Sequence, residues 1–92
     1  MQVSTITVNH ETGLHARPAA LFVQVASKFT SRLWVERGSK KVNAKSIMGV
    51  MSLSVSKGDE VVLIADGKDE KKAMAAIKQL VNSNFTDIPD LD

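Results

Sequence analysis

The sequence predicts a single α+β domain in which three helices cover one face of a mostly antiparallel, four-stranded sheet. Two kinds of segment favour this fold class: short runs of alternating apolar and polar residues, typical of strands, and longer runs with apolar residues at helical spacing. They follow one another in the order β-α-β-β-α-β-α within 92 residues. A chain of this length has room for one modest hydrophobic core, so the helices and the sheet must share it.

The four strands are predicted from alternation and from the turns between them. Residues 4–8 alternate strictly, which places Ile6 and Val8 on the inner face. Gly38 and Ser39 form a two-residue hairpin signal. The expected strands occupy residues 4–8, 33–36, 40–42 and 60–65. The last of them, EVVLIA, is the most apolar and is expected at the centre of the sheet.

Three helices are predicted from apolar spacing and capping residues. The first covers residues 16–27, because Pro18 is tolerated in a first helical turn. Ser46 is a natural N-cap for a short helix over residues 47–53, and Asp69 can cap the last helix. The expected apolar stripes are Ala19, Phe22, Val23 and Ala26, extended by Phe29, on the first helix, and Ala73, Ile77, Leu80 and Val81 on the last.

Composition and patterning narrow the class of protein. The absence of cysteine excludes disulfides, thiolate chemistry and cysteine-ligated zinc, and suits a reducing cytoplasm. The formal charge of +2 is too small to indicate nucleic-acid binding without a focused patch. The longest apolar run, residues 61–65, is far shorter than the ~20 residues of a membrane span, and no signal peptide is apparent. We expect a cytoplasmic protein with a folded domain over residues 1–84 and a flexible tail over 85–92.

His15 is the first candidate functional residue, because it lies where the first helix is expected to begin. Free backbone N–H groups and a partial positive charge gather at a helix N-terminus and favour an anion over a protonated ring. The position therefore suits a neutral, nucleophilic imidazole that carries a phosphoryl group, whose oxygens Arg17 could contact. Each candidate also has a plain interpretation: His15 as a polar loop residue, Arg17 as a chance neighbour, and Ser46 as a cap without further role.

A second group of candidates is apolar. Ile47, Met48 and Met51 lie on a helix too short to bury all its side chains, so some are expected at the surface, where flexible thioethers suit contact with several partners. The alternative is that they belong to the core. A metal site is rejected, because His10 near His15 has no further ligands in sequence. No phosphate-binding glycine motif or other cofactor motif occurs.

Two long motifs, GLHARPAALFVQ and KKVNAKSIMGVMSLSVSKGDEV, resemble the HPr family of the bacterial phosphoenolpyruvate:sugar phosphotransferase system. The resemblance extends over residues 3–83 and implies an open-faced β-sandwich with the element order given above. It further implies that His15 is phosphorylated by Enzyme I and relieved by the sugar-specific IIA domains, with Arg17 contacting the phosphate. Ser46 matches the site used by HPr kinase/phosphorylase, and the family uses the region of Ile47, Met48 and Met51 for docking.

The stretches ARPAALFVQ, KFTS and KKVNAKSIMG are especially similar to the catabolite-repression paralogue Crh. That paralogue typically has glutamine at the position of His15, so this chain combines a Crh-like body with the residue of a carrier. The alternative function is therefore a regulatory protein that acts, when phosphorylated on Ser46, as corepressor for a LacI-type catabolite control regulator.

A small RNA-binding domain is a third possibility, with little support. The chain has four aromatic residues, and three of them, Phe22, Phe29 and Phe85, fall in an expected helix, at its end or in the tail. Trp34 alternates with Leu33 and so is expected on the open face of the sheet. One exposed tryptophan does not make the stacking platform that RNA recognition requires.

Overall fold

The computed structural model describes residues 1–89 and has the predicted order of elements. The strands are β1 (Gln2–Thr7), β2 (Arg32–Arg37), β3 (Lys40–Asn43) and β4 (Glu60–Asp66), and the helices are α1 (Ala16–Ala26), α2 (Ile47–Ser52) and α3 (Glu70–Asn82). The first strand begins two residues before the expected start and ends one residue earlier. Val8 nevertheless stays fully buried just beyond the strand, where its amide donates a hydrogen bond to the carbonyl of Asp59.

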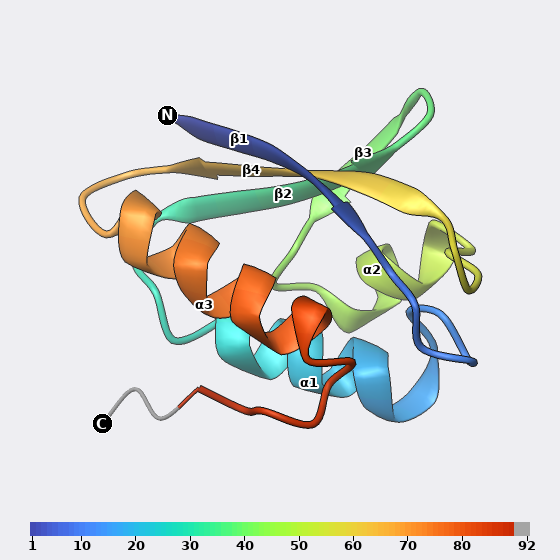
Figure 1. Ribbon diagram of the computed structural model, residues 1–92. Coiled ribbons are helices and arrows are strands. Elements are labelled where there is room, and N and C mark those ends of the chain that lie inside the picture. The colour runs from blue at the N-terminus through green and yellow to red at the C-terminus, as the bar shows by residue number, and fades with distance from the viewer. Residues whose placement is uncertain (90–92) are drawn as a thin grey trace.

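The strands form one sheet in the order β1-β4-β2-β3, and every neighbouring pair is antiparallel. β4 therefore lies inside the sheet, as predicted, with β1 on one side and β2 on the other. All three helices lie on the same side of this sheet, which leaves its other face open (Figure 1). The fold is thus the expected open-faced β-sandwich.

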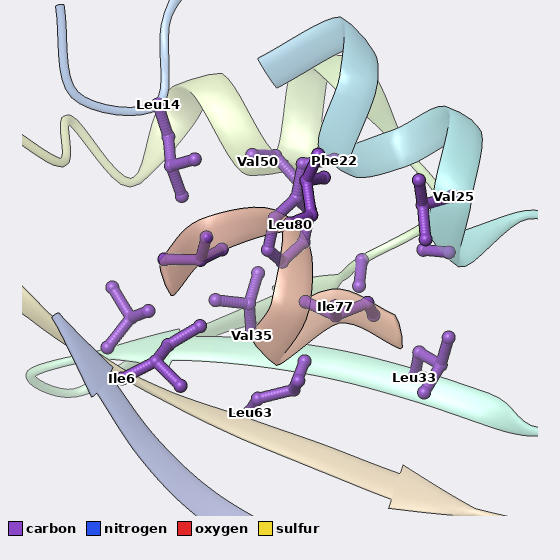
Figure 2. Packing of buried hydrophobic residues seen from close by; sticks show 14 of the residues in the cluster. Ile6, Leu14, Phe22, Val25, Leu33, Val35, Val50, Leu63, Ile77 and Leu80 are labelled. Carbon is purple, nitrogen blue, oxygen red and sulfur yellow. The ribbon is translucent and has the colours of Figure 1, made fainter. Parts of the chain in front are cut away.

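The core lies between the inner face of the sheet and the helices (Figure 2). Alternation along β2 buries Leu33 and Val35, whereas Trp34 between them is half-buried on the open face, as predicted. The Lys41 ammonium lies 5.0 Å from the centroid of the Trp34 ring, in cation–π contact. The tryptophan is thus partly covered by a neighbouring strand's side chain.

The buried face of α1 is wider than the expected apolar stripe and shifted from it. Val23 is only partly buried and packs at the margin of the core, whereas Pro18, Leu21 and Val25, which were not expected in the stripe, are buried. Positions 18, 22 and 25 follow the helical repeat from Pro18, and that phase turns Val23 away from the sheet. The stripe of α3 is confirmed, with Met74 and Ala76 buried in addition.

Asp69 occupies the N-cap position of α3, but its side chain makes no capping hydrogen bond. The expectation of a side-chain cap is wrong. Its carboxylate instead accepts hydrogen bonds from the amide and hydroxyl of both Thr30 and Ser31, in the loop between α1 and β2. The Ser31 hydroxyl, followed by the Thr30 amide, lowers the pKa of Asp69 to about 2. The four donors of this loop, which the fold brings close, bind the Asp69 carboxylate in place of the amides of the first turn of α3.

The first residues of the expected tail pack against the body. Phe85 and Pro89 are buried, and the Gln79 amide donates a 2.7 Å hydrogen bond to the Asp87 carboxylate. The boundary expected after residue 84 therefore falls within a packed segment. The rest of the expected tail, residues 90–92, lies outside the described residues.

Candidate functional site

His15 is the N-cap residue of α1, as its position before Pro18 predicted. The backbone of His15 is extended, with φ −127° and ψ 160°. The residue is half-buried, and its side chain makes no capping hydrogen bond. The first turn of α1 contains no acidic residue. The positive end of the helix is therefore not neutralised from within, which suits an anion on the imidazole.

The residues before His15 are anchored to the segment that follows α2. Gly13 has φ +64°, and a Cβ there would lie 1.9 Å from the carbonyl oxygen of Val55. The Leu14 amide donates to that same oxygen at 3.1 Å, and the Leu14 side chain is fully buried. Leu14 was not among the residues expected from the sequence to shape the site. The signal for it was one apolar residue in an otherwise polar loop.

Ala16, the first residue of α1, has φ +53°, in the left-handed region that residues other than glycine rarely adopt. Such a backbone costs on the order of 1 kcal/mol and persists only where surrounding contacts hold it in place. The buried anchors on either side, Leu14 and Pro18, supply those contacts. The turn that carries His15 is thus held in an uncommon conformation.

Arg17 is exposed and makes no ion pair or side-chain hydrogen bond within residues 1–89. It lies two residues from His15 at the same helix end. A guanidinium without protein partners can turn toward an anion near the helix N-terminus at little energetic cost.

Ser46 is the N-cap of α2, as predicted. Its Oγ accepts a 3.2 Å hydrogen bond from the Gly49 amide, and its carbonyl accepts the first helical bond, at 2.9 Å, from Val50. A Cβ at Gly49 would lie 3.3 Å from both Ser46 Oγ and Val42 Cβ, so the small residue suits this tight turn. Ser46 as a residue is half-buried at the start of a six-residue helix.

Ile47, Met48 and Met51 form an exposed apolar surface, called here the α2 patch. Their exposed fractions are 42%, 81% and 38%, while Val50 on the same helix is fully buried. The expectation that some of these side chains reach the surface is confirmed. α2 contacts α1 and lies beside its N-terminal part in Figure 1, so the helix that carries the patch is near the helix end at which His15 is the N-cap.

The C-terminal end of α2 is held by two cationic side chains of the β2–β3 hairpin. Arg37 donates a 3.2 Å hydrogen bond to the Leu53 carbonyl, and Lys40 donates one of the same length to the Ser52 carbonyl. Arg37 also forms an ion pair with Asp59 at 3.2 Å. Cations at this end complement the helix dipole, so the short helix is fixed at both ends.

Other classes of site find no support in the part of the chain that the structure describes. Residues 1–89 contain no group of three or more potential metal ligands, and His10 Nδ1 accepts a hydrogen bond from the Thr12 amide. The aromatic side chains do not form a stacking surface, because three of them are buried: Phe22, Phe29 and Phe85. The fourth aromatic residue, Trp34, is half-buried on the open face. None of the helices in this range is both long and apolar enough to traverse a bilayer.

Comparison with known proteins identifies relatives over most of the chain. Residues 3–83 match the family described as "PTS HPr component phosphorylation site". The HPr-like protein Crh of Bacillus subtilis strain 168 is 58% identical over 76 residues, which cover 83% of this chain and 89% of that protein. Phosphocarrier protein HPr of Treponema pallidum strain Nichols is 47% identical over 85 residues, which cover 92% and 97%.

Solved structures show the same relationship. HPr-C-His from Thermoanaerobacter tengcongensis has a TM-score of 0.92 and 57% identity, with 97% of this chain and 100% of that chain covered. The swapped dimer of Bacillus subtilis Crh has a TM-score of 0.74 and 54% identity, with coverage of 89% and 94%. The chain therefore belongs to the HPr family, the phosphocarrier proteins of the phosphotransferase system.

Proposed function

We propose that this chain relays a phosphoryl group through His15. A ring nitrogen takes the group from Enzyme I and releases it to the IIA domains of sugar permeases, while Arg17 neutralises charge on the phosphoryl oxygens. The protein is in this sense a carrier with a transient phosphohistidine and not a catalytic enzyme. It works in the cytoplasm and without a cofactor or metal.

One observation carries the proposal: the imidazole of His15 lies at a helix N-terminus that no acidic residue of the first turn neutralises, and its side chain is not used as a cap. The unpaired N–H groups and the helix dipole stabilise the negative charge of a phosphoryl group once it is attached. The exposed Arg17 adds a positive charge on the same helix end.

The direct test is incubation with phosphoenolpyruvate and Enzyme I, followed by intact-protein mass spectrometry. We expect the chain to gain one phosphate that is labile in acid and stable in base. His15→Ala should gain none and should keep its fold, because the half-buried ring makes no capping bond. Lys57→Ala, in an exposed turn before β4, is the control and should be labelled fully. Labelling of His15→Ala would refute the assignment.

A second candidate function is regulation through phosphorylated Ser46. It is favoured by the 58% identity to a protein named HPr-like protein Crh. HPr kinase/phosphorylase would modify the Ser46 hydroxyl, and the product would bind a LacI-type catabolite control regulator. The same experiment separates the two functions: a chain that acts only as a regulator gains no phosphate from Enzyme I but gains one on Ser46 from the kinase and ATP.

The α2 patch is assigned to docking of both Enzyme I and the IIA domains. Apolar side chains that are this exposed, on a helix that contacts α1, suit transient contact with more than one partner. Ser46 lies next to Ile47 in the chain, so a phosphate on Ser46 would change the charge at the margin of this patch. One modification could then select between transfer partners and a regulator that presents arginines.

A further inference from the structure

We propose that His10 and Phe85 form a positioning contact for the loop that carries His15, so that the segment after α3 affects phosphoryl transfer without touching the phosphoryl group. This proposal rests on the proposed function of His15. It concerns residues that the carrier chemistry does not use, and it makes the C-terminal segment a part of the active-site scaffold.

The His10 side chain closes the turn that leads toward His15. Its Nδ1 accepts a hydrogen bond from the Thr12 amide at 3.2 Å and lies 3.0 Å from the Thr12 hydroxyl. The Gly13 amide donates to the His10 carbonyl at 2.9 Å, which closes the same turn through the backbone. The His10 side chain accepts a hydrogen bond from the backbone amide two residues later, as an asparagine side chain does in an Asx turn.

Phe85 holds the other side of this ring. The two ring centroids are 5.8 Å apart and the ring planes are at 88°, the edge-to-face arrangement that aromatic pairs favour. Asn84 and Phe85 have φ +60° and +64°, and the Phe85 amide donates to the Leu80 carbonyl at 2.8 Å. Two consecutive non-glycine residues in the left-handed region turn the chain back at the end of α3. Burial of the Phe85 side chain offsets the energetic cost of this backbone conformation.

The contact reaches His15 through Thr12. The Thr12 hydroxyl lies 3.5 Å from the His15 carbonyl oxygen, and on the opposite side Gly13 and Leu14 are fixed against Val55. The loop is thus held from two directions, by the segment after α2 and by the segment after α3. A reacting group transfers fastest when its geometry is fixed beforehand, so loosening one side should slow transfer.

Three variants test the contact. His10→Ala removes the acceptor and the ring, His10→Asn restores an acceptor for the Thr12 amide without the ring, and Phe85→Leu keeps an apolar side chain but removes the ring edge. Ile88→Ala, at an exposed position of the same segment, is the matched control. Each protein is assayed by NMR for hydrogen exchange of the Thr12 amide, by thermal melting, and for kcat/KM of phosphorylation by Enzyme I.

We expect exchange of the Thr12 amide to be faster by a factor of roughly two to ten in His10→Ala, the range for loss of one hydrogen bond, and kcat/KM to fall by a similar factor. His10→Asn and Phe85→Leu each keep an acceptor for the Thr12 amide but lose the ring contact, so both should fall between His10→Ala and the wild type, and His10→Asn should recover part of both values. A purely structural role would not produce this rescue. Ile88→Ala should match the wild type.

The proposal is overturned if His10→Ala is phosphorylated at the wild-type rate, or if Phe85→Leu leaves both the amide exchange and the rate unchanged. Those outcomes differ from failure of the proposed function, in which the wild type itself accepts no phosphate from Enzyme I.

Discussion

At position 17 an exposed guanidinium lies two residues from His15 and forms no ion pair within residues 1–89. Its neighbour Pro18, by contrast, is buried and fixes the start of α1. The two neighbours therefore have different roles at this helix end. Pro18 determines where the helix begins, and the Arg17 guanidinium is free to contact an anion. Substitution of Arg17 should consequently affect chemistry more than folding.

Arg17→Glu is expected to slow phosphorylation of His15 by roughly ten- to a hundred-fold, the effect of losing a hydrogen bond to a charged group and adding a repulsive carboxylate. Its melting temperature should stay close to that of the wild type, because surface changes rarely exceed ~0.5 kcal/mol. Arg32→Glu, an exposed arginine at the start of β2, is the control and should be phosphorylated normally. Equal rates for Arg17→Glu and wild type would remove Arg17 from the site.

Among the elements, α2 carries the α2 patch within six residues, with Ser46 as the cap before it and two cations of the β2–β3 hairpin bound at its other end. A helix this short is not stable by itself and depends on its caps and on the buried Val50. Its N-terminal end accepts negative charge favourably, whereas its C-terminal end does not. The two serines at its ends, Ser46 and Ser52, allow these effects to be compared within one helix.

Ser46→Asp, an imperfect mimic of phosphoserine, should keep or slightly raise the melting temperature, since a negative charge at a helix N-terminus contributes about 0.3–1 kcal/mol. It should also weaken turnover by Enzyme I, because the charge adjoins the α2 patch, the surface that we propose for docking of an apolar partner surface. Ser52→Asp places the same charge at the other end of the helix and should lower the melting temperature. A Ser46→Asp protein that melts much earlier, or accepts phosphate at the wild-type rate, contradicts this mechanism.

Met48→Glu tests the patch itself. Because 81% of the Met48 residue is exposed, the change should leave folding nearly unaffected. We expect KM for Enzyme I to rise roughly ten-fold, equivalent to about 1.4 kcal/mol of lost docking energy. Val3→Glu is the matched control, because Val3 lies in β1 and 61% of the residue is exposed. This variant should leave KM unchanged. A similar KM increase in both variants would point to net charge and not to docking.

For the molecule as a whole, Asp69 is the carboxylate that links the loop after α1 to the start of α3. Its pKa is lowered to about 2 from the ordinary value of 3.8, first by the Ser31 hydroxyl and then by the Thr30 amide. A lowered pKa in the folded state means that the ionised group stabilises the fold above its ordinary pKa. That contribution is lost as the pH falls from about 4 toward 2.

Asp69→Asn should therefore melt at a lower temperature than the wild type at pH 7, and the difference between the two should narrow as the pH is lowered from about 4 toward 2. Thermal melts at a series of pH values measure this. Asp66→Asn, at the exposed end of β4, is the control. A wild-type-to-variant difference that is constant over this range would show that ionisation of Asp69 does not contribute.

The sequence by itself determined the features that depend on close neighbours along the chain. Alternation defined the buried faces of β2 and β4, helical spacing defined α1 and α3, and the serine at position 46 marked the start of α2. The place of His15 at a helix N-terminus followed from Pro18 in the same way. Strand alternation, helical repeats and capping bonds involve residues within about four positions, which is why they can be inferred without a fold.

Only the tertiary structure decided which distant segments meet. Asp69 was expected to cap its own helix, yet its partners Thr30 and Ser31 lie 39 and 38 positions away. Phe85 was assigned to a tail, yet its ring packs against the ring of His10, in the loop that leads to His15. Hydrogen-bond donors and apolar surface brought close by folding compete with local partners, and the better-satisfied arrangement prevails because buried groups left unpaired are costly. No local pattern in the sequence specifies the outcome of that competition.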